Sequence, residues 1–393
     1  MARVFDVAIV GAGIVGAACA YACARRGLSV VVLERAGLLA GATGSGEGNL
    51  LVSDKLPGPE LELALLSNAL WRRWAAELAG RYGDLELEPK GGLVVTATAA
   101  GLARLRATAD DQAAAGVRVE PVDADGLREH EPAIAPGLAG GVRYPQDMQL
   151  MPARAAVALL AAARDRGADV RLRTEVTALR RDATGAVTGV ETGAGPVTAR
   201  RVVNAAGAWA GELAGPLGAA VPVTPRRGFI LVTEPIPPLV RHKVYSADYL
   251  ENVASDDAGL QNSTVVEGTP AGTILIGATR ELVGFDRRPN PEAVRRLARG
   301  AVRLFPALAR VRLLRVYHGF RPFSPDHLPV LGPDPRAPGL VHAHGHEGAG
   351  IGLAPVTGHL VAQVVTGEAP DVDLRPFDPS RFAVAEGSSR AAA

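Results

Sequence analysis

The segment that most constrains the fold is a glycine-rich turn between two apolar runs within the first 35 residues. Val7–Val10 is a short, continuous apolar run, which predicts a strand buried on both faces of a parallel sheet. Gly11, Gly13 and Gly16 follow it with G-x-G-x-x-G spacing, and an alanine-rich helical stretch separates them from a second apolar run at residues 29–33. This order predicts a β-α-β unit that opens a doubly wound α/β fold.

Each glycine has its own task in such a unit. Gly11 permits the tight turn out of the strand, Gly13 lets a pyrophosphate approach the backbone, and Gly16 lets the helix pack against the sheet. The helix N-terminus offers unpaired N–H groups to the pyrophosphate. Glu34, 18 residues past the last glycine, is placed to hydrogen-bond a ribose diol. The unit therefore predicts a dinucleotide site, and it leaves open whether the ligand is FAD or NAD.

Composition excludes several classes of partner. Lys plus Arg (42) nearly cancels Asp plus Glu (41), so no strong field draws the chain to nucleic acid or to an anionic membrane. With 393 residues, 48% of them hydrophobic and 21% charged, the chain has the composition of an ordinary soluble protein. Only three of its cations are lysines, and we attach no function to that bias.

The two cysteines and the apolar segments bear on location. Cys19 and Cys23 lie four residues apart in the predicted helix, where small apolar packing is their expected role. Without a disulfide framework, a cytoplasmic location is expected. No window of about 20 unbroken apolar residues occurs, so we expect no membrane span.

Three later blocks extend the pattern. Residues 42–49 form a loop of small residues able to wrap a long cofactor with backbone groups, where nicotinamide dehydrogenases usually enter another helix. Residues 201–209 read as an apolar strand that ends in small residues. The third block is Gly-Phe-Arg-Pro at residues 319–322, followed by a glycine-rich stretch at residues 345–355.

With these ordered blocks the chain resembles the D-amino-acid oxidase/glycine oxidase superfamily of FAD enzymes from about residue 4 to about residue 382. Within it, residues 43–66 are most similar to the flavin subunits of opine, proline and hydroxyproline dehydrogenases and of hydrogen cyanide synthase. The resemblance implies an α/β fold, with a Rossmann-like FAD-binding domain of the D-amino-acid oxidase type and a mixed-sheet α+β substrate domain. Residues 314–318, where the sarcosine oxidase-like branch attaches its flavin, contain no cysteine, so the resemblance implies non-covalent FAD.

The family's domain organisation is discontinuous, and the pattern of this chain agrees with it. We predict an FAD-binding domain from residues 1–85, 145–222 and 319–383, a substrate-binding domain from residues 86–144 and 223–318, and a disordered tail at residues 384–393. The expected helices are residues 61–80 and 153–166, and the expected strands are residues 91–96, 170–173, 228–233 and 273–277.

The resemblance implies an activity. We expect FAD-dependent oxidation of the C–N bond of a small amino acid, imino acid or N-substituted amino acid, by hydride transfer to flavin N5, giving an imine that hydrolyses. One alternative is the flavin subunit of a heteromeric dehydrogenase, which passes electrons to an electron-acceptor subunit rather than to oxygen. Another is a catalytically silent FAD-binding subunit, because a fold and a cofactor motif do not guarantee activity.

The residues expected to bind the cofactor belong to the glycine turn, the acid after it, and the small-residue blocks. They are Gly11, Gly13, Ile14, Val15, Gly16, Glu34, Arg35, Ala42, Thr43, Ser45, Gly46, Glu47, Gly48, Asn49, Leu50, Val176, Ala205, Ala206, Gly207, Trp209, Arg321, Gly345, His346, Glu347, Gly348, Ala349, Gly350 and Ile351.

Four residues are candidates for the catalytic site. Arg321 matches the arginine that holds the substrate carboxylate in the glycine oxidase-like branch; its alternative role is a structural ion pair. Tyr245 and Tyr249 fall where the family has active-site aromatics, with packing as the alternative. His346 lies in the turn before the final helix, whose N–H groups are expected to face the pyrimidine end of the flavin.

Three histidines near the C-terminal end also fit a metal site. His342, His344 and His346 alternate and would share one face of a strand, which is a pattern that metal sites use. A strand that enters the flavin loop accounts for them more simply, so we expect no metal.

Overall fold

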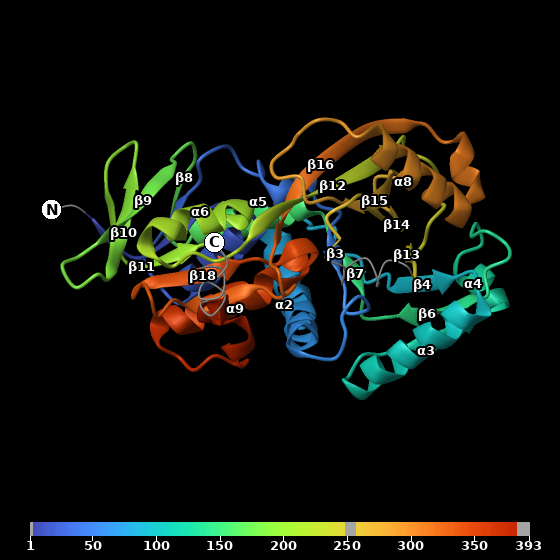
Figure 1. Cartoon of the computed structure of the whole chain (residues 1–393), viewed down its shortest axis with the longest axis horizontal. Coiled ribbons are helices and arrows are strands. Elements are labelled where there is room, and N and C mark those ends of the chain that lie inside the picture. Colours follow the sequence, from blue (N-terminus) through green and yellow to red (C-terminus); the bar gives the residue numbers. More distant parts are fainter. Residues whose placement is uncertain (1–2, 248–256, 383–393) are drawn as a thin grey trace, which may run out of the picture.

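The computed structural model describes residues 3–247 and 257–382, and two large sheets dominate it. Figure 1 shows an elongated molecule with the elements of one sheet gathered in one half and those of the other sheet in the other half. Tyr249 and the tail at residues 384–393 lie outside the described residues.

The first sheet is built on the glycine-rich turn. Its strands follow the order β17-β18-β11-β1-β2-β8, and a β9–β10 hairpin is attached to β11. The neighbours from β18 to β8 pair in parallel, while β17 and the hairpin pair antiparallel. The bounds are β1 (Val4–Val10), β2 (Val30–Leu33), β8 (Asp169–Arg171), β9 (Val176–Arg181), β10 (Val187–Thr192), β11 (Val197–Asn204), β17 (Val330–Pro333) and β18 (Leu340–His344). The predicted Rossmann-like sheet is confirmed.

Cover on both faces explains why the strands of this sheet are apolar throughout. Val7 and Ile9 pack into a cluster with the helices of one face, whereas Phe5, Ala8 and Val10 pack toward the β9–β10 hairpin on the other face. The helices of the first face are α1 (Ile14–Arg25), α2 (Pro59–Tyr82), α5 (Pro152–Arg164) and α9 (Gly350–Thr366), whereas α6 (Ala210–Ala214) lies on the face of the hairpin. The predicted helices at residues 61–80 and 153–166 correspond to α2 and α5.

The second sheet is mixed, as expected. It follows the order β16-β12-β15-β14-β13-β4-β6-β5, in which β13 and β4 are parallel and the other pairs antiparallel. Its strands are β4 (Gly92–Thr96), β5 (Glu120–Asp123), β6 (Gly140–Tyr144), β12 (Thr224–Thr233), β13 (Lys243–Ser246), β14 (Gln261–Gly268), β15 (Ile274–Arg280) and β16 (Leu313–Phe323). The boundaries proposed between the two domains stay a prediction.

One face of the second sheet is apolar and covered by a helix. Leu297 and Ala301 of α8 (Pro291–Leu304) pack with Phe229 and Ile276 of the sheet. The side chain of Asn290 accepts hydrogen bonds from two backbone N–H groups of the first turn and so caps α8. Helices α3 (Ala99–Ala114) and α4 (Ala124–His130) complete this half. The opposite face meets the loop that follows β2, and the site lies at that seam.

Short elements connect the two halves. β3 (Asn49–Leu50) pairs antiparallel with β7 (Met148–Gln149) beside the seam. The 3-10 turns are η1 (Ala42–Ser45), η2 (Gly207–Trp209), η3 (Gly215–Leu217), η4 (Pro306–Arg310), η5 (Glu347–Ala349), η6 (Arg375–Phe377) and η7 (Pro379–Phe382).

One helical stretch within the described ranges has the length and composition to cross a membrane. It covers Glu347–Thr366, and most of it is buried inside the protein. The core helix of a soluble protein passes the same test, so this stretch is weak evidence for a span. The expected cytoplasmic location stays a prediction.

The closest approach of two helices in the first half occurs where α9 crosses α1. A Cβ at Gly358 would stand 2.5 Å from the backbone carbon and oxygen of Ala18 and 2.9 Å from the backbone nitrogen of Cys19. Backbone atoms cannot turn aside as a side chain can, so the crossing requires a residue without a Cβ at this position.

We predict that Gly358→Ala lowers the free energy of unfolding by about 1–3 kcal/mol, because the two helices must separate. Chemical denaturation measures it. Gly80→Ala is the matched control, since Gly80 is also helical and a Cβ there would meet nothing within 4 Å; it should be neutral or stabilising by up to about 1 kcal/mol. Equal stability of Gly358→Ala and the wild type would contradict the close crossing.

Candidate active site

The glycine-rich turn lies where the carboxyl ends of β1, β2 and β11 meet. Gly11 has a φ of +103°, and a Cβ there would stand 2.6 Å from the carbonyl oxygen of Ala205. Glycine alone satisfies both conditions. The first turn of α1 contains no acidic residue, so its N-terminus keeps a partial positive charge at this point.

Glu34, the acid predicted to bind a ribose, is held at the same carboxyl edge of the first sheet. The carboxylate of Glu34 accepts hydrogen bonds from the backbone N–H groups of Ala12 and Ala36, both at 2.9 Å. Next to it, the guanidinium of Arg35 lies 4.0 Å from the ring centre of Trp209. Asn204 shapes the turn after β11, because its side chain donates to the carbonyl oxygen of Ala210 at 2.9 Å.

The loop at residues 42–49 lies between the first sheet and the second. Thr43 Oγ1 accepts a hydrogen bond from the backbone N–H of Ile14 at 2.9 Å, which fixes the loop to the start of α1. A Cβ at Gly46 would meet Ile351 Cδ1 at 2.5 Å, and one at Gly319 of β16 would meet the side chain of Ser45 at 2.6 Å. The structure therefore brings the predicted loop, β16 and the start of α9 together.

The other small-residue blocks fall around this loop. Val176 begins β9 and packs against the apolar cluster that contains Val10 and Leu33. His346 is buried, and Nε2 of its ring lies 2.9 Å from Thr357 Oγ1. Burial lowers the pKa of His346 to about 3, so the imidazole is neutral and a weak base.

Arg321 lies on the seam face of β16. Its Nη1 donates to the carbonyl oxygen of Thr279 on β15 at 2.9 Å. Arg226 is its cross-strand neighbour on β12, is fully buried, and pairs with Glu347 at 2.6 Å. Two guanidinium groups therefore lie beside the turn that starts α9, and a planar guanidinium suits a carboxylate.

Tyr245 belongs to a buried hydrogen-bond network, and its role as an active-site aromatic stays a prediction. It is fully buried on β13, and its hydroxyl is hydrogen-bonded to Ser53 Oγ, which in turn donates to Asp147. Asp147 also accepts the backbone N–H of Val52 at 2.8 Å. Burial raises the pKa of Asp147 to about 7. This network fastens residues 52–55 to the second sheet. Nothing in the sequence signals Asp147 before β4, β6 and β13 are placed side by side.

A second polar cluster crosses the seam and joins two residues of the predicted loop to two residues that sequence reasoning missed, Lys243 and Glu267. Lys243 of β13 is buried; its Nζ donates to Glu267 Oε2 of β14 at 2.5 Å and to Asn49 Oδ1 of the loop. Asn49 Nδ2 donates to Glu47 Oε2 at 3.1 Å. We call Glu47, Asn49, Lys243 and Glu267 the carboxylate–lysine cluster. The scarcity of lysine is the sequence signal that could have pointed to Lys243, because the side chains of the three lysines are only 2%, 5% and 12% exposed.

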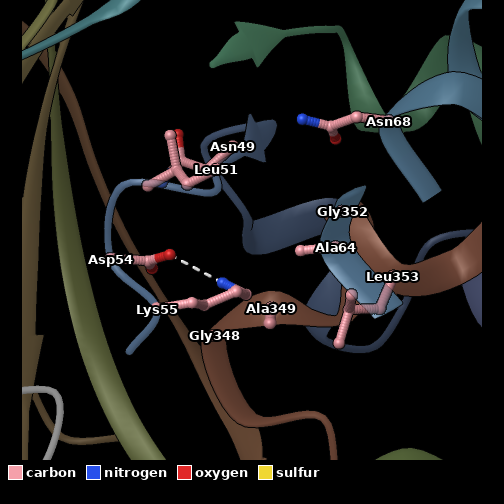
Figure 2. A pocket seen from close by; sticks show the side chains of 10 residues that line it. All are labelled: Asn49, Leu51, Asp54, Lys55, Ala64, Asn68, Gly348, Ala349, Gly352 and Leu353. Carbon is pink, nitrogen blue, oxygen red and sulfur yellow. Dashed lines mark hydrogen bonds and ion pairs between the residues drawn. The ribbon is translucent and has the colours of Figure 1, made fainter. Parts of the chain in front are cut away.

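A small pocket opens beside this cluster. It is lined by side chains from residues 49–55, from α2 and from the start of α9 with the turn before it. Figure 2 shows Asp54 and Lys55 opposite Gly348 and Ala349. Lys55 Nζ and Asp54 Oδ1 lie 2.6 Å apart. The described residues contain no group of three His, Cys, Asp or Glu side chains that could hold a metal ion. Of the three alternating histidines, His342 and His344 contact each other, with Nδ1 of the first 2.7 Å from Nε2 of the second, whereas His346 contacts Thr357.

These residues fit FAD. A turn that only glycine can occupy, a helix N-terminus and a fixed carboxylate suit the pyrophosphate and ribose, and the loop at residues 42–49 continues toward the second sheet. Cys19 and Cys23 are both buried inside α1, away from β16. Burial raises the pKa of Cys23 to about 12, so this thiol stays protonated and unreactive.

Comparison with known proteins shows the family to which the chain belongs. The profile of the DAO family, FAD dependent oxidoreductase, matches residues 6–364. Hydrogen cyanide synthase subunit HcnC of Pseudomonas aeruginosa is 33% identical over 430 aligned residues, which cover 97% of this chain and 97% of that protein. Glycine oxidase of Geobacillus kaustophilus is 33% identical over 386 residues, covering 97% of this chain and 98% of that protein.

Solved structures give the same result. The structure of the Geobacillus kaustophilus glycine oxidase superposes with a TM-score of 0.88 at 32% identity, covering 96% of this chain and 98% of that one. Iminodiacetate oxidase from Chelativorans superposes with a TM-score of 0.82 at 26% identity, covering 95% of this chain and 98% of that one. The expected resemblance and the FAD cofactor are confirmed.

We predict that Gly11→Ala purifies with little or no flavin, because its Cβ would meet the backbone of Ala205 where the pyrophosphate must approach. The ratio of absorbance at the visible flavin band to that at 280 nm measures bound flavin. Gly27→Ala is the control: Gly27 also has a positive φ, but a Cβ there meets nothing within 4 Å. Full flavin content in Gly11→Ala would remove the turn from the cofactor site.

We predict that Asp147→Asn gains stability relative to the wild type as pH rises from about 4 to about 7. The folded-state pKa of Asp147 is raised above its usual 3.8 to about 7, so the folded wild type binds this proton more tightly than the unfolded chain does. Its stability therefore falls through this window, and asparagine does not titrate. Urea unfolding of both proteins at pH 4.5, 6 and 8 measures the stability of Asp147→Asn minus that of the wild type, and a value that stays constant or falls as pH rises would contradict a raised pKa.

Proposed function

This chain belongs to the DAO family of FAD dependent oxidoreductases, and from that premise we propose that it oxidises the C–N bond of a small amino acid, imino acid or N-substituted amino acid. The observation that carries the proposal is the position of Arg321 on the seam face of β16, next to Arg226 and to the turn before α9. The relatives that support it are named for glycine and iminodiacetate, which are small amines bearing carboxylates.

The residues of this chain bind and orient the substrate. FAD, when bound, accepts the hydride that leaves the substrate carbon. Arg321 binds the substrate carboxylate and so fixes which hydrogen of the substrate carbon can leave. The Tyr245–Ser53–Asp147 network keeps residues 52–55 in place beneath the second sheet. The oxidised substrate is an imine, which water hydrolyses after release.

A second candidate function is that of a flavin subunit that passes its electrons to a partner subunit. The chain is similar over nearly its whole length to a protein named as a subunit of hydrogen cyanide synthase. β16 ends the second sheet and exposes Leu313, Leu314 and Val316, which are 44%, 66% and 41% exposed. The same strand carries Arg321, five residues beyond Val316, so a partner bound at this exposed apolar surface would contact the strand that carries the site arginine.

We predict that one or more small amino acids bleach the flavin of the purified protein under anaerobic conditions. The panel contains D-, L- and N-substituted amino acids, and the visible spectrum reports reduction. Admitting air then separates the two candidates: fast recolouring indicates an oxidase, whereas slow recolouring that a dye acceptor accelerates indicates a subunit that needs a partner. If no member of the panel bleaches bound flavin, both candidates fail and the silent subunit remains.

Arg321→Met tests the residue that carries the proposal. Loss of a charged hydrogen bond to the carboxylate should weaken substrate binding on the order of 10- to 100-fold, with flavin content retained. Arg315→Met is the matched control, because Arg315 lies on the same strand and is exposed. Equal substrate affinity in Arg321→Met and Arg315→Met would remove Arg321 from the site.

A further inference from the structure

The carboxylate–lysine cluster contains two buried acids and one ammonium group, which pairs with Glu267 and reaches Glu47 through Asn49. Glu267 is fully buried and Glu47 is 8% exposed. Within the described residues, Glu267 Oε2 is paired with Lys243 at 2.5 Å, and Glu47 Oε2 accepts from Asn49 at 3.1 Å. Glu267 Oε1 and Glu47 Oε1 are buried and have no hydrogen-bond partner among these residues.

Two buried carboxylate oxygens that accept no hydrogen bond lower the stability of the folded chain. Burying a polar atom without a partner costs about 1–3 kcal/mol, and more when the group is charged. The two acids are close enough that the charge of Glu47 raises the pKa of Glu267, in addition to the larger effect of burial and against the opposing charge of Lys243. The site therefore has the electrostatics and the free acceptors to bind a further cationic donor.

The position of the cluster favours an organic cation as that donor. A metal ion would need more ligands than the described residues gather anywhere. Glu47 and Asn49 belong to the loop predicted to hold FAD, and Lys243 and Glu267 belong to the sheet face that carries Arg321. A group bound here lies where the cofactor loop and the substrate sheet meet.

We propose that Glu47 and Glu267 bind the ammonium group of the amino-acid substrate, and that Glu267 takes up one of its protons before oxidation. This proposal rests on the proposed function. In the proton transfer an N–H bond of the ammonium group breaks, its electron pair stays on nitrogen, and the proton forms an O–H bond with Glu267. The products are a neutral amine, whose lone pair can assist hydride loss from the adjacent carbon, and a neutral carboxylic acid.

The groups that face Glu267 set how it titrates. Lys243 lies beside it on β13, Lys90 lies before β4 and donates to Glu88 and to the carbonyl oxygen of Gly268, and Glu47 comes from the loop. Tyr317 faces both acids from β16; burial and then the charges of Glu47 and Glu267 raise its pKa above the usual value, so it stays protonated. Lys243 keeps Glu267 able to ionise, and Glu47 keeps it basic.

The test uses two probes that differ only by an ammonium group, isobutyrate and 2-aminoisobutyrate. Neither amine oxidation nor turnover interferes, because 2-aminoisobutyrate has no hydrogen on the carbon next to nitrogen. Each probe is titrated into the FAD-loaded protein, and perturbation of the visible flavin spectrum gives its Kd. The wild type should bind 2-aminoisobutyrate on the order of 10- to 100-fold more tightly than isobutyrate.

Variants assign this preference to the cluster. Glu267→Gln should abolish it, and Glu47→Gln tests the same site from the loop if Glu267→Gln fails to fold or to keep its flavin. Glu281→Gln is the matched control and should keep the preference. Glu281 is also a buried glutamate of this sheet, but it pairs with Arg227 and with Asn290 at the start of α8, on the opposite face. Absence of the preference in the wild type, or its survival in Glu267→Gln and Glu47→Gln, overturns the proposal.

A second measurement, the pH dependence of flavin reduction, tests the proton transfer to Glu267. With an amine that bleaches the flavin, the second-order rate of reduction in the wild type should level off once Glu267 is ionised. In Glu267→Gln it should keep rising about tenfold per pH unit up to the pKa of the free amine, because only the neutral amine can then react. Failure of every amine to bleach the flavin would overturn the proposed function itself, whereas bleaching with identical pH profiles overturns this inference alone.

Discussion

The parallel pairing of β1 with β11 is the constraint on which the rest of the structure depends. It places Val4 opposite Thr198 and Val10 opposite Asn204, so residues far apart in the sequence form the centre of one sheet. The chain between them must leave this sheet and return, and the part after β11 must do the same before β17. These two excursions supply β4–β6 and β12–β16, which join through the β13–β4 pair into the second sheet. The β13–β4 pair therefore joins both excursions into one sheet beside the glycine turn, and the loop at residues 42–49 lies between this second sheet and the first.

That seam must be polar, and its polarity explains the two buried networks. A loop that lies against a sheet face brings backbone and side-chain polar groups out of water, and each needs a partner. Tyr245, Ser53 and Asp147 satisfy one another completely, so they make the seam rigid. Glu47 and Glu267 do not, since each keeps one oxygen without a donor among the described residues. The first network positions the loop, and the second leaves acceptors for a ligand.

The sequence predicted the parts of the site that depend on local pattern. The strand, glycine turn, helix and acid at residues 7–34 could be interpreted one after another, because each signal involves neighbouring residues. Lys243 and Glu267 gave no such signal, because they meet only through the pairing of β13 with β14 and the approach of Asn49 from another sheet. Tyr245 was assigned by its place in the family pattern, and its burial behind Ser53 could not be foreseen from that. The rarity of lysine was visible in the sequence. It carried structural information, because the few lysines of this arginine-rich chain have side chains that are 12% exposed or less.

Strand register connects the arginine to the two acids. Arg321 lies opposite Arg226 on β12. Glu47 packs against Gly277 of β15. Because Ile276 pairs with Leu231, the next residue, Gly277, lies level with Ile230 of β12. From Arg226 to Ile230 the strand advances four steps, or roughly 13 Å at the usual rise per residue. The Arg321 guanidinium extends into that interval, because its Nη1 lies over Gly228, so the space between this group and the level of Glu47 is shorter than the strand distance. An amino acid carries its carboxylate and its ammonium group on one carbon. A substrate held by Arg321 at one end and by Glu47 and Glu267 at the other must therefore be small, and a long chain joining the two charged groups would not fit between them.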